Sequence, residues 1–139
     1  IDLCWRILLS GHSIKAVPDS KVYHLGGGSL PASNPRKTYL NFRNNLLMLH
    51  KNLPDSVRAP KLFKRRLLDT IAWAKFVATL DFKNAAAIVR AHRDFARMRR
   101  EYNIHPDRNL LGERPDTRIN ILTSYYLKRK HRYSELSFH

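Results

Sequence analysis

The sequence contains a single cysteine, Cys4, in 139 residues. One cysteine cannot form a disulfide within the chain, and such sparse use of cysteine is typical of proteins in reducing compartments. We therefore expect a cytoplasmic protein. Hydrophobic residues make up 43% of the chain, which is enough for the core of one domain and excludes a disordered tail.

Long apolar runs are also absent. Within residues 61–80, no more than five consecutive residues are uncharged. A transmembrane helix needs about 20 apolar residues. This stretch therefore cannot span a bilayer.

Acidic residues are scarce, since 11 Asp and Glu stand against 26 Lys and Arg, for a net charge of +15. Residues 1–35 carry only +1 of this charge, which leaves +14 in residues 36–139. The second part is basic enough to bind a polyanion, whether phospholipid headgroups, a nucleic acid or an acidic substrate.

Common catalytic and metal-binding signatures are missing as well. The sequence has no P-loop, no paired cysteine ligands, no Ser/His/Asp signature and no internal repeat. Five scattered histidines lack the spacing of metal ligands: His12, His50, His92, His105 and His131.

The pattern that is present begins as α/β. Residues 2–9 have apolar positions at helical spacing, with Asp2 at the N-terminus and Gly11 just past the C-terminus. Residues 13–17 alternate as a short strand, and residues 21–24 follow a turn as a second strand. We predict an α/β fragment in which one helix precedes two short strands.

The second predicted strand ends at His24 and a glycine-rich segment, residues 25–31. Consecutive glycines permit positive φ and let backbone N–H groups approach a bound anion. This pattern predicts an active-site loop with His24 at its edge. The alternative is a flexible connection beside a half-buried histidine.

Asn34 and Pro35 open a predicted helix over residues 36–52. Arg43 lies in its middle among asparagines 41, 44 and 45. Three asparagines lower the helix propensity, so this cluster either binds a ligand through its amides or belongs to a solvated polar face. Arg36 and His50 share the face of Arg43, and we expect them to be solvated.

Two more helices are predicted over residues 61–80 and 84–102, followed by a polar loop and a last helix over residues 117–126. The helices over residues 61–80 and 84–102 form either a membrane-interface element or two packed surface helices with solvated charge. One face of the first helix is apolar: Phe63, Leu67, Ile71, Ala74 and Val77/Ala78. In the membrane interpretation, the side chains that insert are Trp73, Phe76 and Phe95, and those that face anionic headgroups are Arg90, Arg93, Arg97 and Arg100.

Three motifs in order resemble the C-terminal part of bacterial family 2 glycosyltransferases. They are Asp-Leu-Cys-Trp-Arg at residues 2–6, Val-Tyr-His-Leu-Gly-Gly-Gly-Ser at 22–29, and Arg-Lys-Thr-Tyr leading into Asn-Phe-Arg-Asn-Asn at 36–45. The resemblance implies an inverting, nucleotide-sugar-dependent enzyme of the GT-A (Rossmann-like) fold. Residues 1–53 would be the end of its catalytic domain, and residues 54–139 a helical, basic, membrane-peripheral extension. Since the chain starts without Met in the middle of a motif, we expect a fragment that lacks the donor-binding half and is inactive alone.

The resemblance also implies roles for single residues. Asp2 and Arg6 would belong to the catalytic acidic motif, with Arg6 pairing to Asp2 at i,i+4. His24 would approach a divalent metal, Mn²⁺ or Mg²⁺, held mostly by residues outside this chain. Donor diphosphate and substrate would be bound by Gly26, Gly27, Gly28, Ser29, Arg43 and Asn44.

The implied function is transfer of a sugar from a nucleotide-sugar donor to a saccharide or lipid-linked acceptor during cell-surface polysaccharide synthesis. Its expected location is the inner face of the cell membrane. A basic nucleic-acid-binding helical module is the alternative, since it explains the charge and the interleaved Tyr39, Phe42 and Arg43. A membrane-peripheral adaptor explains only the two amphipathic helices.

Overall fold

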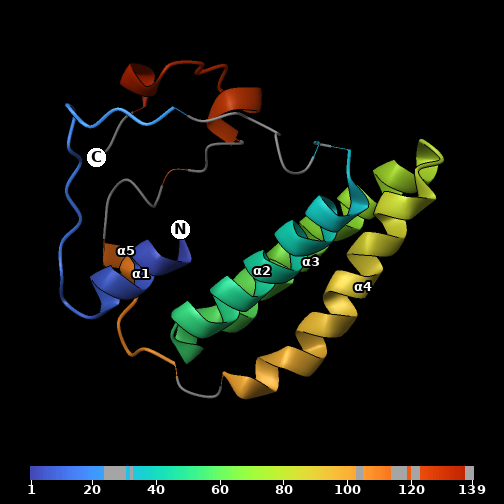
Figure 1. Ribbon diagram of the computed structural model, residues 1–139, viewed down its shortest axis with the longest axis horizontal. Helices are drawn as coiled ribbons and strands as arrows, with labels where there is room; N and C mark the ends of the chain where they lie inside the picture. The colour runs from blue at the N-terminus through green and yellow to red at the C-terminus, as the bar shows by residue number, and fades with distance from the viewer. Residues whose placement is uncertain (24–30, 32, 103–104, 114–118, 120–122, 137–139) are drawn as a thin grey trace. The chain divides into compact units, whose positions relative to one another are not determined.

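A computed structural model of the chain describes residues 1–23, 31, 33–102, 105–113, 119 and 123–136 (Figure 1). The chain forms two compact units, Ile1–Asp107 and Arg108–His139. The boundary predicted at residue 53 falls inside the first unit.

The first unit is a helical assembly. Its elements are α1 (Asp2–Leu9), α2 (Pro35–Asn52), α3 (Asp55–Ala78), α4 (Phe82–Met98) and the short 3₁₀ helix η1 (Arg99–Glu101). The three long helices lie side by side (Figure 1). From the end of α2, α3 runs back to the start of α4, antiparallel to both. Consequently α2 and α4 run in the same direction and share the most extensive contact.

Local capping explains where these helices begin and end. The Asn34 side chain accepts a hydrogen bond from the Arg36 N–H at 2.9 Å, and Pro35 occupies the first helical position. At the start of α4, Asp81 caps the Asn84 N–H. Gly11 has a φ of +84° and ends α1 with the paired backbone bonds of a Schellman motif. The predicted bounds of α1, the start of α2 and the role of Gly11 are confirmed.

The core lies where α2, α3 and α4 meet. Leu46 and Phe95 are completely buried, and Leu47 and Leu62 pack with them. A polar contact joins the first turns of α2 and α4, because the Thr38 hydroxyl donates to Asn84 Oδ1 at 2.6 Å. Asn84 Nδ2 donates in turn to Asp81 Oδ2 and to the Ser33 carbonyl. All polar atoms of this buried amide are therefore satisfied.

The predicted α/β, GT-A-type fold is wrong for this chain. No strand occurs among the residues that the structure describes, and the predicted strand at residues 13–17 is irregular. Of the second predicted strand, residues 21–23 are irregular too, and His24 lies outside the described residues. The larger apolar side chains of the predicted first strand, Ile14 and Val17, remain 48% and 66% exposed. Two short strands have no stability without further strands or a helix to bury their apolar face.

The second unit is described over parts of its length. It contains α5 (Leu110–Glu113), a π-helical turn η3 (Thr123–Leu127) and a 3₁₀ turn η4 (Tyr133–Glu135). Of the predicted last helix, residues 117, 118 and 120–122 lie outside the described residues. Across both units, none of the described helices combines the length and apolarity needed to cross a membrane.

The buried Asn84 amide gives a test of the α2–α4 contact. Asn84→Ala removes the side-chain amide that pairs with the Thr38 hydroxyl, Asp81 Oδ2 and the Ser33 carbonyl, so we expect a loss of about 2–3 kcal/mol in the free energy of unfolding. Thr70→Ala removes an exposed side-chain hydrogen bond within α3 and should change it by less than about 0.5 kcal/mol. Urea unfolding followed by circular dichroism measures both, and equal losses would contradict the account.

Candidate functional site

A cavity of about 290 Å³ lies between the start of α1, the middle of α2 and the end of α4. We call it the Asp2 cavity. It combines charged and amide groups with an apolar wall. Its lining residues are Asp2, Arg43, Asn44, Leu47, Met48, Lys51, Met98 and Tyr102.

The Asp2 carboxylate of this cavity has three side-chain partners. Lys51 Nζ donates to Asp2 Oδ2 at 2.6 Å, and Asn52 Nδ2 donates to Asp2 Oδ1 at 2.8 Å. Arg6 Nε lies 3.3 Å from the same carboxylate, at the predicted i,i+4 spacing. Asn52 is 2% exposed and also donates to the Met48 carbonyl. These bonds fix α1 to the end of α2.

This environment keeps Asp2 ionised. Partial burial raises the pKa of the carboxyl, but the hydrogen bonds from Lys51 and Asn52 and the charges of Lys51 and Arg6 outweigh it, so the pKa lies below the ordinary value. A carboxylate with a lowered pKa is a weak proton acceptor. Asp2 is therefore suited to orient a ligand and its neighbouring cations, and poorly suited to be a general base.

Arg43 is held in place from two directions. Its Nε and Nη2 donate to Asn44 Oδ1 at 3.0 and 2.9 Å, and its Nη1 donates to the Tyr39 hydroxyl at 3.0 Å. Tyr39 in turn donates to Asp94 Oδ2 at 2.8 Å. The guanidinium is thus ordered before any ligand arrives, which lowers the entropic cost of binding an anion.

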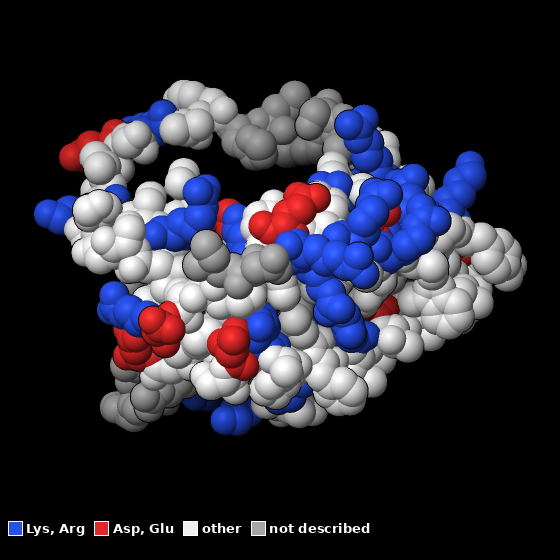
Figure 2. All heavy atoms as spheres, turned by 90° about the horizontal axis from the view of Figure 1, so that it is seen from below, with Lys and Arg blue, Asp and Glu red and all other residues white. Residues whose placement is uncertain are grey.

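Further arginines gather around Tyr39 and Asp94. The Arg90 guanidinium lies 4.3 Å from the centre of the Tyr39 ring, and Arg97 reaches Asp94 Oδ1 at 3.4 Å. The pKa of Asp94 is lowered mainly by the hydrogen bond from Tyr39 and also by the charges of the nearby arginines. Desolvation of the carboxyl raises it by less. In Figure 2, Lys and Arg side chains adjoin one another over a wide area, whereas Asp and Glu form small separate groups. Around Tyr39 and Asp94 the arginines at positions 43, 90, 93 and 97 outnumber the one carboxylate that they approach.

The structure brings three of the predicted site residues together. Asp2, Arg43 and Asn44 line one cavity although about 40 residues separate them in the sequence. Arg6 does not line the cavity but pairs with Asp2. The remaining predicted site residues lie outside the described residues: His24, Gly26, Gly27, Gly28 and Ser29.

Lys51, Asn52 and Tyr102 were not predicted as site residues. Lys51 lies seven residues after Asn44 and eight after Arg43, so helical spacing places it on their face of α2. Its ammonium group also lies 5.7 Å from the centre of the Tyr102 ring. Periodicity alone could have found Lys51, but only the path of the chain brings Asp2 and Tyr102 to it.

The prediction that His50 is solvated is wrong. Its ring meets Phe95 and His105 edge to face, with centroids 5.8 and 4.9 Å away, and its Nε2 lies 3.2 Å from the Arg99 carbonyl oxygen. Burial is the main cause that lowers the pKa of both histidines, and the positive charge of Arg58 adds to it. Both rings are therefore neutral parts of the packing at neutral pH.

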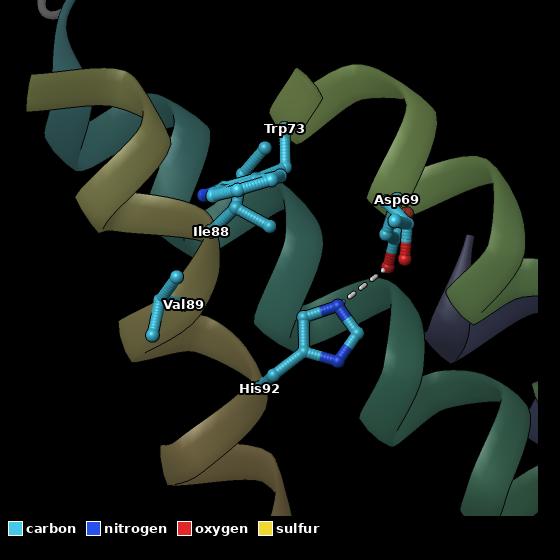
Figure 3. A pocket seen from close by; sticks show the side chains of 6 residues that line it. Asp69, Trp73, Ile88, Val89 and His92 are labelled. Carbon is cyan, nitrogen blue, oxygen red and sulfur yellow. Dashed lines mark hydrogen bonds and ion pairs between the residues drawn. The ribbon is translucent and has the colours of Figure 1, made fainter. Parts of the chain in front are cut away.

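A second cavity, of about 300 Å³, lies between α3 and α4 (Figure 3). Trp73, Ile88 and Val89 form its apolar wall, and His92 Nε2 meets Asp69 Oδ2 at 3.0 Å beside it. Asp69 is 1% exposed and is also paired with Arg65 at 2.8 Å. Thr70 also lines this cavity, but its hydroxyl donates to the Arg66 carbonyl at 2.9 Å and not to His92. The Asp69–His92 pair therefore acts as a link between α3 and α4.

The His50–His105 contact predicts a pH dependence. Because the folded state lowers both pKa values below the ordinary 6.5, the unfolded state binds more protons near that pH, and stability should fall as pH drops from 7.5 to 5.5. His50→Phe keeps a ring against Phe95 but cannot titrate. Its melting temperature should therefore fall less over the same range, as measured by scanning calorimetry. An identical fall in both proteins would show that these rings do not set the dependence.

Comparison of the sequence with models of known protein families and with characterised proteins finds no match, and neither does comparison with solved structures. The glycosyltransferase resemblance therefore remains a prediction from residues 1–53. What the structure adds is the joint position of Asp2, Arg43 and Asn44.

Proposed function

We propose that this chain is part of a nucleotide-sugar-dependent glycosyltransferase that transfers a sugar to a saccharide or lipid-linked acceptor in cell-surface polysaccharide synthesis. One observation carries the proposal. Asp2 and the Arg43–Asn44 pair were singled out in two separate motifs, and they line the same cavity. If the two motifs only stabilised their own helices, nothing would require their side chains to line a common cavity.

The groups of the cavity suit a phosphorylated or polyhydroxyl ligand. Arg43 and Lys51 offer two cations against one carboxylate, and both are positioned by hydrogen bonds. Such preorganised charge stabilises negative charge on a departing diphosphate or on a phosphate of the acceptor. The Asn44 amide can bind sugar hydroxyls, and the Tyr102 ring offers a flat apolar surface for a sugar face.

Proton removal from the acceptor hydroxyl needs a base of ordinary or raised pKa. Asp2 does not meet this requirement, because its partners lower its pKa. In this proposal Asp2 holds Lys51 and Arg6 in place. The base, and with it the nucleotide-binding half, belongs to residues outside this chain.

The resemblance also implies Mn²⁺ or Mg²⁺. The Asp2 cavity does not fit such an ion, because its one carboxylate already binds two cationic side chains. In the part of the chain that the structure describes, no three His, Cys, Asp or Glu side chains are grouped to hold a metal. The proposed enzyme would bind its metal mainly through residues outside this chain, and we assign no step to a metal here.

The proposed place of action is the cytoplasmic face of a membrane, where lipid-linked acceptors are found. A net charge of +15 supports attachment to anionic headgroups, since each basic residue near such a surface contributes about 1 kcal/mol. The finer prediction that Phe95 inserts into the bilayer is wrong, because Phe95 is completely buried in the core.

Binding of a sugar phosphate such as glucose 1-phosphate tests the cavity. We expect weak binding by the 139-residue chain, and Arg43→Ala should weaken it about tenfold, because a charge-assisted hydrogen bond is lost. Arg36→Ala removes the same charge from an exposed position of the same helix and should leave the affinity unchanged. Isothermal titration calorimetry measures all three proteins. Equal effects of both substitutions would show that the sugar phosphate binds through overall positive charge and not in the Asp2 cavity. Tight binding of duplex DNA or RNA, without binding of the sugar phosphate, would favour the nucleic-acid module.

The absence of a donor site in this chain is a separate prediction. Without the nucleotide-binding half, the chain should transfer no sugar and should not bind UDP- or dTDP-sugars tightly, with or without manganese. Calorimetric titration with these donors checks it. Micromolar binding would contradict the division of the enzyme proposed here.

A further inference from the structure

The outward face of α3 is apolar. Phe63, Leu67 and Ile71 follow one another at four-residue spacing and are 71%, 55% and 60% exposed. We call these three residues the α3 stripe. Residues four apart lie on the same side of a helix, so the stripe is one continuous row.

The opposite face of α3 supplies the contacts to the bundle. Leu62 is 9% exposed, and Asp69 is buried and bonded to His92 of α4. Ile71 follows Asp69 by two residues, which places it about 200° round the helix. The stripe therefore lies on the solvent side of α3, and its Ile71 end points away from the core, where a surface helix normally carries polar side chains.

Basic residues border the stripe. Lys61, Lys64 and Lys75 are exposed on α3. From residue 56 to residue 80 the one acidic residue is Asp69, which is turned into the bundle. The exposed charges of residues 56–80 are thus all cationic, and Asp55 at the start of α3 is paired with Arg58, so an anionic occupant complements this face.

We infer that the α3 stripe is the surface that inserts into an anionic lipid bilayer. This inference rests on the proposed membrane location and names the face that makes the contact. An interfacial helix buries its apolar side about 5–10 Å into the boundary between headgroups and acyl chains. Flanking lysines extend their ammonium groups to the phosphates. A single projecting row of Phe, Leu and Ile with lysines beside it has this form.

Charge argues against a second copy of the chain as the occupant. Two stripes packed on each other would bring two sets of lysines together on proteins that each carry a net charge of +15. The face of α4 is a poorer candidate for insertion. Its exposed apolar side chains, Phe82 and Val89, stand apart and are interspersed with exposed basic residues rather than following one another in a row.

Sedimentation with lipid vesicles tests the assignment on the complete 139-residue chain. With vesicles containing phosphatidylserine, Leu67→Ser/Ile71→Ser should lower the partition coefficient about tenfold. The cause is the lost free energy of transferring two aliphatic side chains from water into the lipid. Ile14→Ser/Val17→Ser removes two exposed apolar side chains elsewhere and should leave it unchanged. Circular dichroism verifies that both variants keep their helices.

The outcomes separate the inference from the location on which it rests. If the unchanged chain ignores phosphatidylserine vesicles at low salt, the proposed location fails and the inference with it. If the chain binds and Leu67→Ser/Ile71→Ser binds equally well, while Arg93→Glu/Arg97→Glu loses binding, the location stands and the α3 stripe is the wrong face. The inference would also be overturned if the chain formed dimers that Leu67→Ser/Ile71→Ser abolishes. It would be overturned as well if an acidic protein competed with the vesicles for the α3 stripe.

A fluorophore reports the inserted face directly. In a Cys4→Ser background, an environment-sensitive dye at Ile71→Cys should shift its emission to the blue on these vesicles. The same dye at Ala86→Cys, an exposed position of α4, should not shift. A shift at position 86 without one at position 71 would reverse the assignment.

Discussion

The packing of α2 against α4 is the contact on which the rest of the first unit depends. Leu46 and Phe95 are removed entirely from water at this contact, and Thr38 with Asn84 fixes the register of the two helices at their first turns. Because one side of α2 is committed to the core, its neighbouring side presents Arg43, Asn44 and Lys51 to the cavity. The site is therefore a consequence of how α2 is buried.

Three carboxylates, two of them buried and one half-buried, bind basic side chains in the first unit. Asp2 binds Lys51 and Arg6, Asp69 binds Arg65 and His92, and Asp94 receives Tyr39 and Arg97. Each pair or cluster links two helices of the unit or orders a cation beside it. Since 26 basic residues stand against 11 acidic ones, most of the positive charge has no acidic counterpart in the chain and can attract external anions.

Local patterns predicted α1, α2 and much of α4, because capping residues and apolar spacing act over one or two turns. In α4, Ile88, Ala91 and Phe95 recur at spacings of three and four, and all three are buried. The predicted strands failed because alternation specifies a strand only where a sheet exists to receive it. The Arg6–Asp2 pair followed from helical spacing and is present.

Features that depend on long-range packing could not be predicted in the same way. His50 was assigned to solvent because it shares a helix face with arginines, yet Phe95 and His105 reach it from distant segments. The apolar face of α3 gave no indication of whether it would turn inward or outward. In the structure, Leu62 and Asp69 occupy the buried face of α3, and Asp69 is bonded across to His92 of α4.

The central claim is that Asp2, Arg43 and Lys51 act as one binding site. Nuclear magnetic resonance of the ¹⁵N-labelled chain with added sugar phosphate tests it most directly, because each residue reports separately. The account predicts that the signals of Asp2, Arg43, Asn44 and Lys51 shift together along one saturable curve, while those of the exposed α3 lysines do not move. Shifts spread over all basic residues without saturation, or confined to one of the two segments, would contradict it.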